Sequence, residues 1–139
     1  MQWDGTRHAG FTAGEPWIPV NPNHTEINAA AQEHDAGSVL AHYRRLVALR
    51  HDEPVVAHGD FTMLLAQHPH IYAFVRRLGD VRLLVLGNFS SDPQPVDVPD
   101  ASSWANADIV LSNVDPVDGE GLELRPWEAR VYKLDLEST

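Results

Sequence analysis

The chain has 139 residues, of which 43% are hydrophobic and 22% are charged, so its composition is that of a globular protein rather than a disordered or fibrous one. Ten Lys and Arg against twenty Asp and Glu give a formal net charge of −10, which disfavours nucleic acid and anionic membranes as partners. There is no Cys, no signal peptide and no apolar run of about 20 residues, so we expect a cytoplasmic protein.

The first 36 residues have no sustained hydrophobic period and are rich in turn formers. Asp4-Gly5 and Asn21-Pro22-Asn23 are typical of turns, so the segment is predicted to be a long loop, with one helical turn near Ile27–Ala31. A loop longer than about 15 residues is uncommon in a compact domain unless it serves a site or links domains. Trp3 and Trp17 lie in this loop, where an indole ring is suited to lining a pocket or stacking on a sugar.

The next segment, "SVLAHYRRLVALRHD" at 38–52, has the period of an amphipathic helix. Ser38 or Asp35 is placed to cap its N-terminus, and Pro54 follows as a stop signal. Its apolar side chains fall on one face: Val39, Leu40, Tyr43, Leu46 and Val47. A helix with such a face needs something to cover it.

From about Val55 the pattern changes to short β-like runs separated by turns. The runs are "FTMLLA" (61–66), "IYAFVRR" (71–77), "VRLLVLGNF" (81–89), "QPVDVP" (94–99), "DIVLSN" (108–113) and "ARVYKL" (129–134). The first three are predicted to form a meander, with the almost wholly apolar third run as a central strand. Five to seven antiparallel strands of this kind predict a small β-sandwich, in which Trp104 and Trp127 take core or edge positions.

No group of residues forms a self-sufficient active site by its spacing. His68 and His70 flank a proline in a turn, His51 ends a helix, and no zinc-binding spacing includes these residues or His58, so no metal site is predicted. A nucleophile elbow and a glycine-rich phosphate loop are also missing. Serines such as Ser38 and Ser90 are interpreted as cap and turn residues, and we predict no cofactor and no catalytic residue in this chain.

Several motifs in order resemble the C-terminal part of bacterial α-glucosidases. The series "MQWD…AGF…PWIPVNPN…IN…Q…SVLAHYRRLVALRH", then "IYAFVR", "LLVLGNFS" and "LRPWEARVYKL", is similar to the α-amylase family of glycoside hydrolases. The branch that it resembles holds oligo-1,6-glucosidase, dextran glucosidase, trehalose-6-phosphate hydrolase and sucrose isomerase. The resemblance runs from Met1 to about Leu134.

The resemblance implies a division of the chain into two parts. In this family a (β/α)₈ barrel, with catalytic groups at the C-terminal ends of its strands, precedes an antiparallel β domain. Residues 1–54 would be the remnant of a barrel that is otherwise missing, with the last loop at 1–36 and the last helix at 38–53. Residues 55–139 would be the C-terminal antiparallel β domain.

The same resemblance places part of the first loop near a sugar. It implies that Gln2, Trp3 and Asp4, and with less weight Phe11, form a wall of the substrate pocket rather than reacting groups. Trp3 and Asp4 could alternatively only pin the loop to the barrel rim. The family's nucleophilic Asp, acid/base Glu and second Asp lie on earlier barrel strands, and its substrate-binding Arg would come just before Met1, so the chain is expected to be inactive alone.

Two functions remain open on these grounds. In the first, the chain is the C-terminal segment of a retaining α-glucosidase acting on α-linked gluco-oligosaccharides; in the second, it is a stand-alone β-sandwich module for sugar binding or interaction. The helix face of Val39, Tyr43, Leu46 and Val47 favours the first, because a module evolved to live alone should be polar there. We expect this face to pack on the β domain or to mediate self-association in the isolated chain. In the family that the chain resembles, the residues that set the linkage preference, α-1,4 or α-1,6, and isomerase activity lie mostly on earlier loops.

Overall fold

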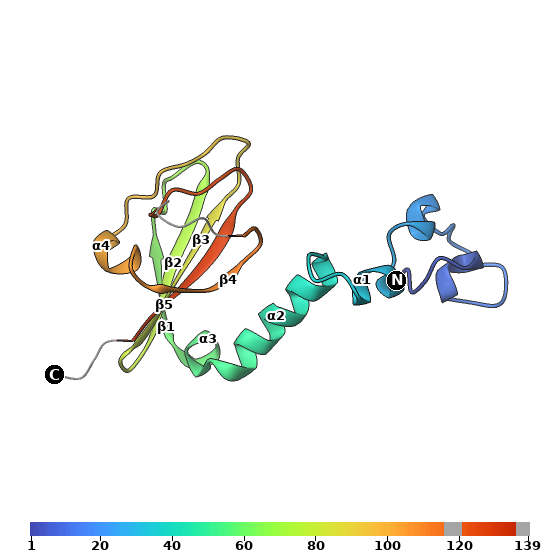
Figure 1. Ribbon diagram of the computed structural model, residues 1–139, viewed down its shortest axis with the longest axis horizontal. Helices are drawn as coiled ribbons and strands as arrows, with labels where there is room; N and C mark the ends of the chain where they lie inside the picture. Colours follow the sequence, from blue (N-terminus) through green and yellow to red (C-terminus); the bar gives the residue numbers. More distant parts are fainter. Residues whose placement is uncertain (116–120, 136–139) are drawn as a thin grey trace. The chain divides into compact units, whose positions relative to one another are not determined.

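The computed structural model describes residues 1–115 and 121–135. The chain forms two compact units, Met1–Ala48 (unit 1) and Leu49–Thr139 (unit 2), which are drawn in Figure 1 and are described separately below. None of the described helices has the length and apolarity needed to cross a bilayer.

Unit 1 is mostly irregular chain, as predicted for residues 1–36. Two short 3-10 helices, η1 (Arg7–Gly10) and η2 (Pro22–Thr25), interrupt it. The helical turn expected near Ile27–Ala31 is helix α1 (Ala29–Glu33). Asn28 caps α1, because its Oδ1 accepts a hydrogen bond of 2.8 Å from the backbone N–H of Ala31.

Helix α2 (Val39–Asp52) confirms the predicted amphipathic helix almost residue for residue. Of the two candidate caps, Ser38 fills the role: its Oγ accepts a bond of 3.1 Å from the N–H of Ala41, while Asp35 accepts from Gly37 in the preceding turn. No side chain of α2 is buried. The predicted apolar face is therefore largely open, with Val39 80% and Tyr43 63% exposed.

The chain does not turn into a strand directly after α2. Pro54 ends α2 but also begins a second helix, α3 (Pro54–His58), at a position where its missing N–H costs nothing. Two adjacent β-branched residues, Val55 and Val56, made this stretch resemble the start of a β region. The stretch is helical instead, and within this helix the side chain of Val55 is buried, with only 1% of it exposed.

Unit 2 is built on one five-stranded antiparallel sheet. Its strands are β1 (Asp60–Leu64), β2 (Ile71–Leu78), β3 (Val81–Asn88), β4 (Asp108–Ser112) and β5 (Ala129–Asp135), in the order β1-β2-β3-β5-β4. The predicted meander is confirmed as β1-β2-β3, and the apolar run of 81–89 is the central strand. A register shift lies between Ile109 and Leu111 in the β4–β5 pairing.

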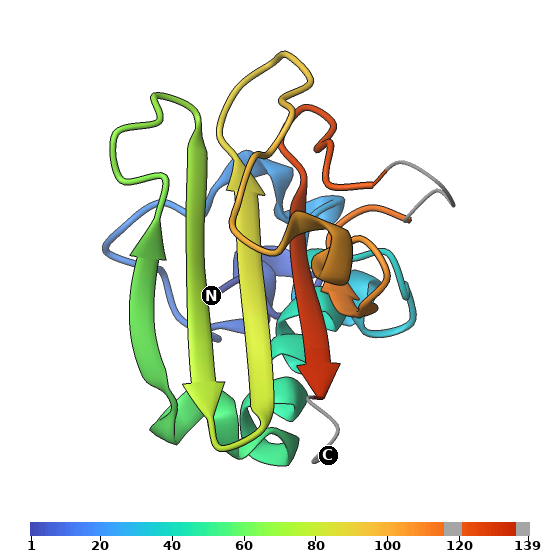
Figure 2. The same ribbon diagram turned by 90° about the vertical axis from the view of Figure 1, so that its left-hand side faces the viewer.

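The core lies against one face of this sheet, which we call the inner face. The inner face contributes Ile71, Ala73, Leu84, Leu86 and Tyr132, and the opposite layer contributes Val96, Val98, Trp104, Leu122 and Leu124. Figure 2 shows the chain after β3 folding back across the sheet, so that helix α4 (Ala101–Trp104) lies in front of β5. The predicted class, an antiparallel β domain with a helix and loop before it, is confirmed.

The predicted strand at 94–99 is wrong in detail. Val96 and Val98 are buried with the alternation of a strand, but only Gln94 forms a β-bridge, with Leu124. Pro95 and Pro99 lack the N–H groups that a ladder would need. Within the described residues the second layer is therefore irregular chain with one bridge and a short helix, rather than a second sheet.

A buried network of ion pairs and hydrogen bonds is centred on Glu128. Glu128 is fully buried; its Oε1 accepts from Arg130 Nε at 2.5 Å and its Oε2 accepts from the backbone N–H of Arg125 at 2.7 Å. Arg130 also donates to Tyr132 Oη at 3.2 Å. Burial alone would raise the pKa of Glu128, but the hydrogen bonds from Arg130 and Arg125 outweigh it and lower that pKa below its ordinary value.

Candidate functional site

The residues expected to border a sugar lie in a short extended segment at the start of unit 1. Backbone hydrogen bonds fix this segment on two sides: Trp3 N–H donates to Ala9 C=O at 2.9 Å, and the N–H groups of Ala29 and Ala30 donate to the carbonyls of Gln2 and Trp3, each at 2.9 Å. The side chain of Gln2 donates to the backbone carbonyl of Ile27. Gln2 and Trp3 are thereby held between η1 and α1.

Asp4 is tied down by its own loop. Its Oδ1 accepts from the N–H of Thr6 at 2.9 Å and from the hydroxyl of Thr6 at 2.5 Å, and these bonds lower the pKa of Asp4. A carboxyl group with a lowered pKa is ionised at neutral pH and has no proton to give. In this geometry the Asp4 carboxylate is held by hydrogen bonds within its own loop.

The carboxylate of Asp4 lies directly over Gly10. Any side chain at Gly10 would place its Cβ 2.6 Å from Asp4 Oδ2, and the backbone of Gly10 has φ +64°. His8 and Ala9 share this left-handed conformation, with φ of 63° and 54°. Two consecutive non-glycine residues in this region are uncommon and persist only where surrounding contacts hold them, as at many binding sites.

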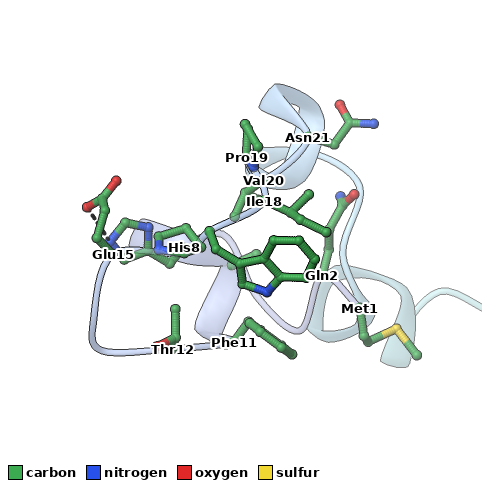
Figure 3. A pocket seen from close by; sticks show the side chains of 13 residues that line it. Met1, Gln2, His8, Phe11, Thr12, Glu15, Ile18, Pro19, Val20 and Asn21 are labelled. Atoms are coloured by element: carbon green, nitrogen blue, oxygen red, sulfur yellow. Dashed lines mark ion pairs between the residues drawn. The ribbon is translucent and has the colours of Figure 1, made fainter.

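Beside this turn the loop encloses an open cavity of about 540 Å³ (Figure 3). Its lining is Met1, Gln2, His8, Ala9, Phe11, Thr12, Glu15, Pro16, Trp17, Ile18, Pro19, Val20 and Asn21. Apolar rings and chains predominate, and the polar side chains are those of Gln2, Thr12, Asn21 and the facing pair of His8 and Glu15, whose Nε2 and Oε2 atoms are 3.9 Å apart. This mixture of flat apolar surface and separate polar groups is suited to a small polar ligand with apolar faces.

Two of the four residues singled out from the sequence line this cavity, namely Gln2 and Phe11. Trp3 and Asp4 do not line it; Trp3 is 51% exposed elsewhere on the loop, and the carboxylate of Asp4 lies over Gly10. Sequence reasoning missed His8 and Glu15, which no motif marked. Their side chains meet only because the left-handed turn of η1 reverses the chain.

A second hollow lies on the other side of Gln2, with a volume of about 470 Å³. It is lined by Met1, Gln2, Ile27, Asn28, Ala29, Gln32, Val39, Leu40 and Tyr43. The N-terminal half of the apolar face of α2 thus forms a wall of this hollow. Its lining is mostly apolar, so it fits another hydrophobic side chain better than it fits a sugar.

The described part of the chain was predicted to hold no metal site. Among residues 1–115 and 121–135, no group of three His, Asp or Glu side chains is placed to hold a metal ion. His68 lies in the turn before β2, where its Nδ1 accepts from the backbone N–H groups of His70 and Ile71. Its role there is to shape the turn.

Two protein-family models match successive parts of this chain. A family model described as the α-amylase catalytic domain matches residues 1–59, and the model of the α-amylase SusG C-terminal domain matches residues 71–131. The chain belongs to the α-amylase family of glycoside hydrolases.

Individual members of the α-amylase family match nearly the whole chain. It is 43% identical to the oligo-1,6-glucosidase of Parageobacillus thermoglucosidasius, over 98% of this chain and 25% of that protein. The structure of trehalose-6-phosphate hydrolase from Bacillus licheniformis matches with a TM-score of 0.86 and 34% identity, covering 96% of this chain and 25% of that one. Isomaltulose synthase from Klebsiella sp. matches with a TM-score of 0.86 and 38% identity, covering 95% and 24%. The chain spans about a quarter of the length of these relatives.

Proposed function

We propose that this chain is the closing segment of a retaining α-glucosidase that acts on α-linked gluco-oligosaccharides. In this proposal residues 1–54 are the last loop and helix of a (β/α)₈ barrel, and residues 55–139 are its C-terminal β domain. The observation that carries it is the order of the two family matches, catalytic domain first and C-terminal domain second, along one continuous chain.

The loop of unit 1 would supply one wall of the sugar pocket. Gln2 and Phe11 line the cavity, and Trp3 would present its exposed indole to the same pocket from the neighbouring part of the loop. Asp4 would act indirectly, by holding Gly10 and the turn of η1 in place. An aromatic ring beside an amide is the usual way in which a protein surface recognises the apolar face and the hydroxyls of a pyranose.

The chemistry itself would lie outside this chain. Retaining glycosidases need two carboxyl groups about 5 Å apart, one as nucleophile and one as acid and base. Asp4 is unsuited to the acid role because its pKa is lowered. The chain alone is therefore proposed to be inactive, and the cytoplasmic location expected from its sequence stays a prediction.

An activity assay tests this proposal. The purified chain should not hydrolyse p-nitrophenyl α-glucoside, whereas a chimera in which it replaces the matching quarter of the P. thermoglucosidasius oligo-1,6-glucosidase should hydrolyse it. In the chimera Trp3→Ala should raise KM more than it lowers kcat, because it removes a binding surface. Turnover by the isolated chain that disappears in Asp4→Asn would overturn the assignment.

The open face of α2 gives a second test. Val39, Tyr43, Leu46 and Val47 are all exposed in the single chain, from 37% for Val47 to 80% for Val39. In the complete enzyme these side chains would pack on the barrel, and in the isolated chain they would drive self-association. A stand-alone module that stays monomeric at high concentration with this face in water would speak for the alternative function.

A further inference from the structure

A tight turn before β5 displays a tryptophan in a conformation that tryptophan rarely adopts. The turn spans residues 125–128 and is closed by a hydrogen bond of 3.2 Å from the N–H of Glu128 to the C=O of Arg125. Trp127, its third residue, has φ +58° and is 60% exposed. A turn with proline second and a left-handed third residue normally has glycine or asparagine in third place. The chain therefore holds a large, solvent-facing indole at a position that favours glycine.

Hydrogen bonds from other segments hold this turn in place. The N–H of Trp127 donates to the C=O of Ser90 at 3.2 Å, and the C=O of Trp127 accepts from Asn113 Nδ2 at 2.8 Å. Asn113 Oδ1 in turn accepts from the N–H of Ala129 at 2.8 Å. A strained backbone persists only where its surroundings hold it, and such residues are frequent at ligand sites. The frame around Trp127 thus presents the indole to solvent in one orientation.

Phe89 lies opposite Trp127 on the neighbouring chain segment. The N–H of Asn88 donates to the C=O of Glu128 at 2.8 Å, and the next bond along the pair is the one from Trp127 to Ser90. This register places Phe89 and Trp127 across from each other, where side chains of an antiparallel pair are close neighbours. Phe89 is 66% exposed. Two exposed rings from different segments therefore adjoin at this end of the sheet.

A hollow of about 440 Å³ continues from Phe89 and supplies polar groups. It is lined by His68, Pro69, His70, Ile71, Tyr72 and Phe89. Figure 2 shows the loop between β1 and β2, the end of β3 and the start of β5 at the same end of the sheet. Since His68 Nδ1 accepts two backbone N–H groups, the proton of the neutral ring lies on Nε2, which can donate to a hydroxyl.

We propose that Trp127, Phe89 and this hollow, together called the sheet-end site, bind an α-linked gluco-oligosaccharide. Aromatic rings beside imidazole and phenol groups fit the apolar faces and the hydroxyls of pyranose units. The described lining of the hollow has no carboxylate and no Lys or Arg, which suits a neutral ligand, and the net charge of −10 disfavours a polyanion. The choice of a glucose-based ligand rests on the proposed function, whereas the site itself shares no residue with the cavity of unit 1.

A titration of the isolated chain tests the sheet-end site directly. The four tryptophans give four indole N–H signals in a ¹⁵N-labelled chain, and Trp127→Phe identifies the signal of Trp127. Isomaltotriose or maltotriose should shift this signal with a dissociation constant on the order of 1 mM, while the signal of the buried Trp104 stays in place. No shift of the Trp127 signal at about 20 mM sugar, well above that constant, would overturn the proposal.

A glycine variant separates binding from folding. Trp127→Gly removes the indole but supplies the residue that the left-handed position favours, so the melting temperature should not fall. Isothermal titration with isomaltotriose should then detect at least tenfold weaker binding at the sheet-end site. Trp17→Gly, which removes an exposed indole from unit 1, is the matched control and should leave the affinity of this site unchanged. A lower melting temperature of Trp127→Gly would mean that the indole stabilises the fold, and would overturn the proposal.

The remaining outcomes distinguish this inference from the proposed function. An inactive chimera, with the sugar-dependent shift of Trp127 intact in the isolated chain, would overturn the proposed function and support the sheet-end site. An active chimera without that shift would overturn the sheet-end site alone. Equal shifts with cellotriose would contradict the preference for α-linked chains. A shift that follows protein concentration instead of sugar would assign the surface to a second copy of the chain, and would also overturn the proposal.

Discussion

The two units of this chain differ in what holds them together. Unit 2 buries a cluster of aliphatic and aromatic side chains between its sheet and the layer that contains Trp104. Unit 1 buries only Ala9, Asn28 and Ser38 among its described residues, and its large apolar side chains point into water: Trp17 is 92% exposed. Backbone and side-chain hydrogen bonds shape unit 1, but each contributes little net free energy in water. Among the described residues, unit 2 has a hydrophobic core of its own, whereas unit 1 has none.

The strongest way to test this contrast is to remove one tryptophan from each unit. Trp104→Ala should lower the free energy of unfolding by about 3–5 kcal/mol, because it opens a cavity in the core and removes the ring that Arg82 covers at 5.2 Å. Trp17→Ala should change it by less than about 0.5 kcal/mol. Urea denaturation, monitored by far-UV circular dichroism, measures both free energies of unfolding. If the two variants lost similar amounts of stability, the contrast between the units would be wrong.

The buried ion network gives the next largest effect. Glu128→Gln removes the buried negative charge that accepts from the guanidinium of Arg130, so unfolding should become easier by about 3 kcal/mol at pH 7. Since the folded-state pKa of Glu128 is lowered, its contribution is present above the unfolded-state pKa of about 4.3 and is lost as the pH falls through the folded-state value. The difference in melting temperature between the wild type and Glu128→Gln should therefore disappear in melting curves recorded at increasingly acid pH. A difference in melting temperature that stays constant down to pH 2 would contradict this.

A moderate effect is expected where α3 meets the sheet. Arg76→Ala removes two hydrogen bonds to the carbonyls of Val55 and Gly59, which should cost about 1–3 kcal/mol. Arg77→Ala is the matched control, because Arg77 is exposed and donates only a local bond to Gly79. Amide exchange should show faster opening of α3 in Arg76→Ala. If both variants behave alike, the two carbonyl contacts do not stabilise α3.

The smallest effect on stability is expected on α2. Tyr43→Gln together with Val47→Gln should change the free energy of unfolding by less than about 0.5 kcal/mol, since both side chains are exposed. Sedimentation velocity should nevertheless show weaker self-association than in the Arg50→Gln control. Loss of stability without any change in association would mean that this face is covered within the chain itself.

The sequence predicted those elements whose local pattern and burial agree. The helix at 38–52, with Ser38 as one of its two candidate caps, and the strands at 71–77, 81–89 and 129–134 combine a clear hydrophobic period with local turn or cap signals. The pattern failed at 94–99 and at Val55, where side chains are buried with a strand-like sequence but the backbone forms no ladder. Burial alternation alone does not specify hydrogen bonding, and prolines removed the donors in the first case.

The candidate site was less predictable for a different reason. Gln2 and Phe11 were identified through resemblance, and both line the cavity, but His8 and Glu15 became part of it through three consecutive left-handed residues. A left-handed backbone at Ala9 is not signalled by its residue type, and histidine adopts this conformation more often than most residues but still only in a minority of cases. The proximity of Trp3 to the pocket stays a prediction, since the structure places its ring outside the cavity lining.

The hydrogen bonds from Ala29 and Ala30 to the carbonyls of Gln2 and Trp3 have a consequence for protein engineering. They join two stretches of loop that are separated by more than twenty positions, so neither can be transplanted by itself into another scaffold. A graft intended to transfer this pocket wall would have to carry residues 2–11 together with 21–30, including Asp4 and its glycine partner. Libraries that randomise only the large apolar positions between these two anchors, Trp17 and Ile18, would leave the frame of the loop intact.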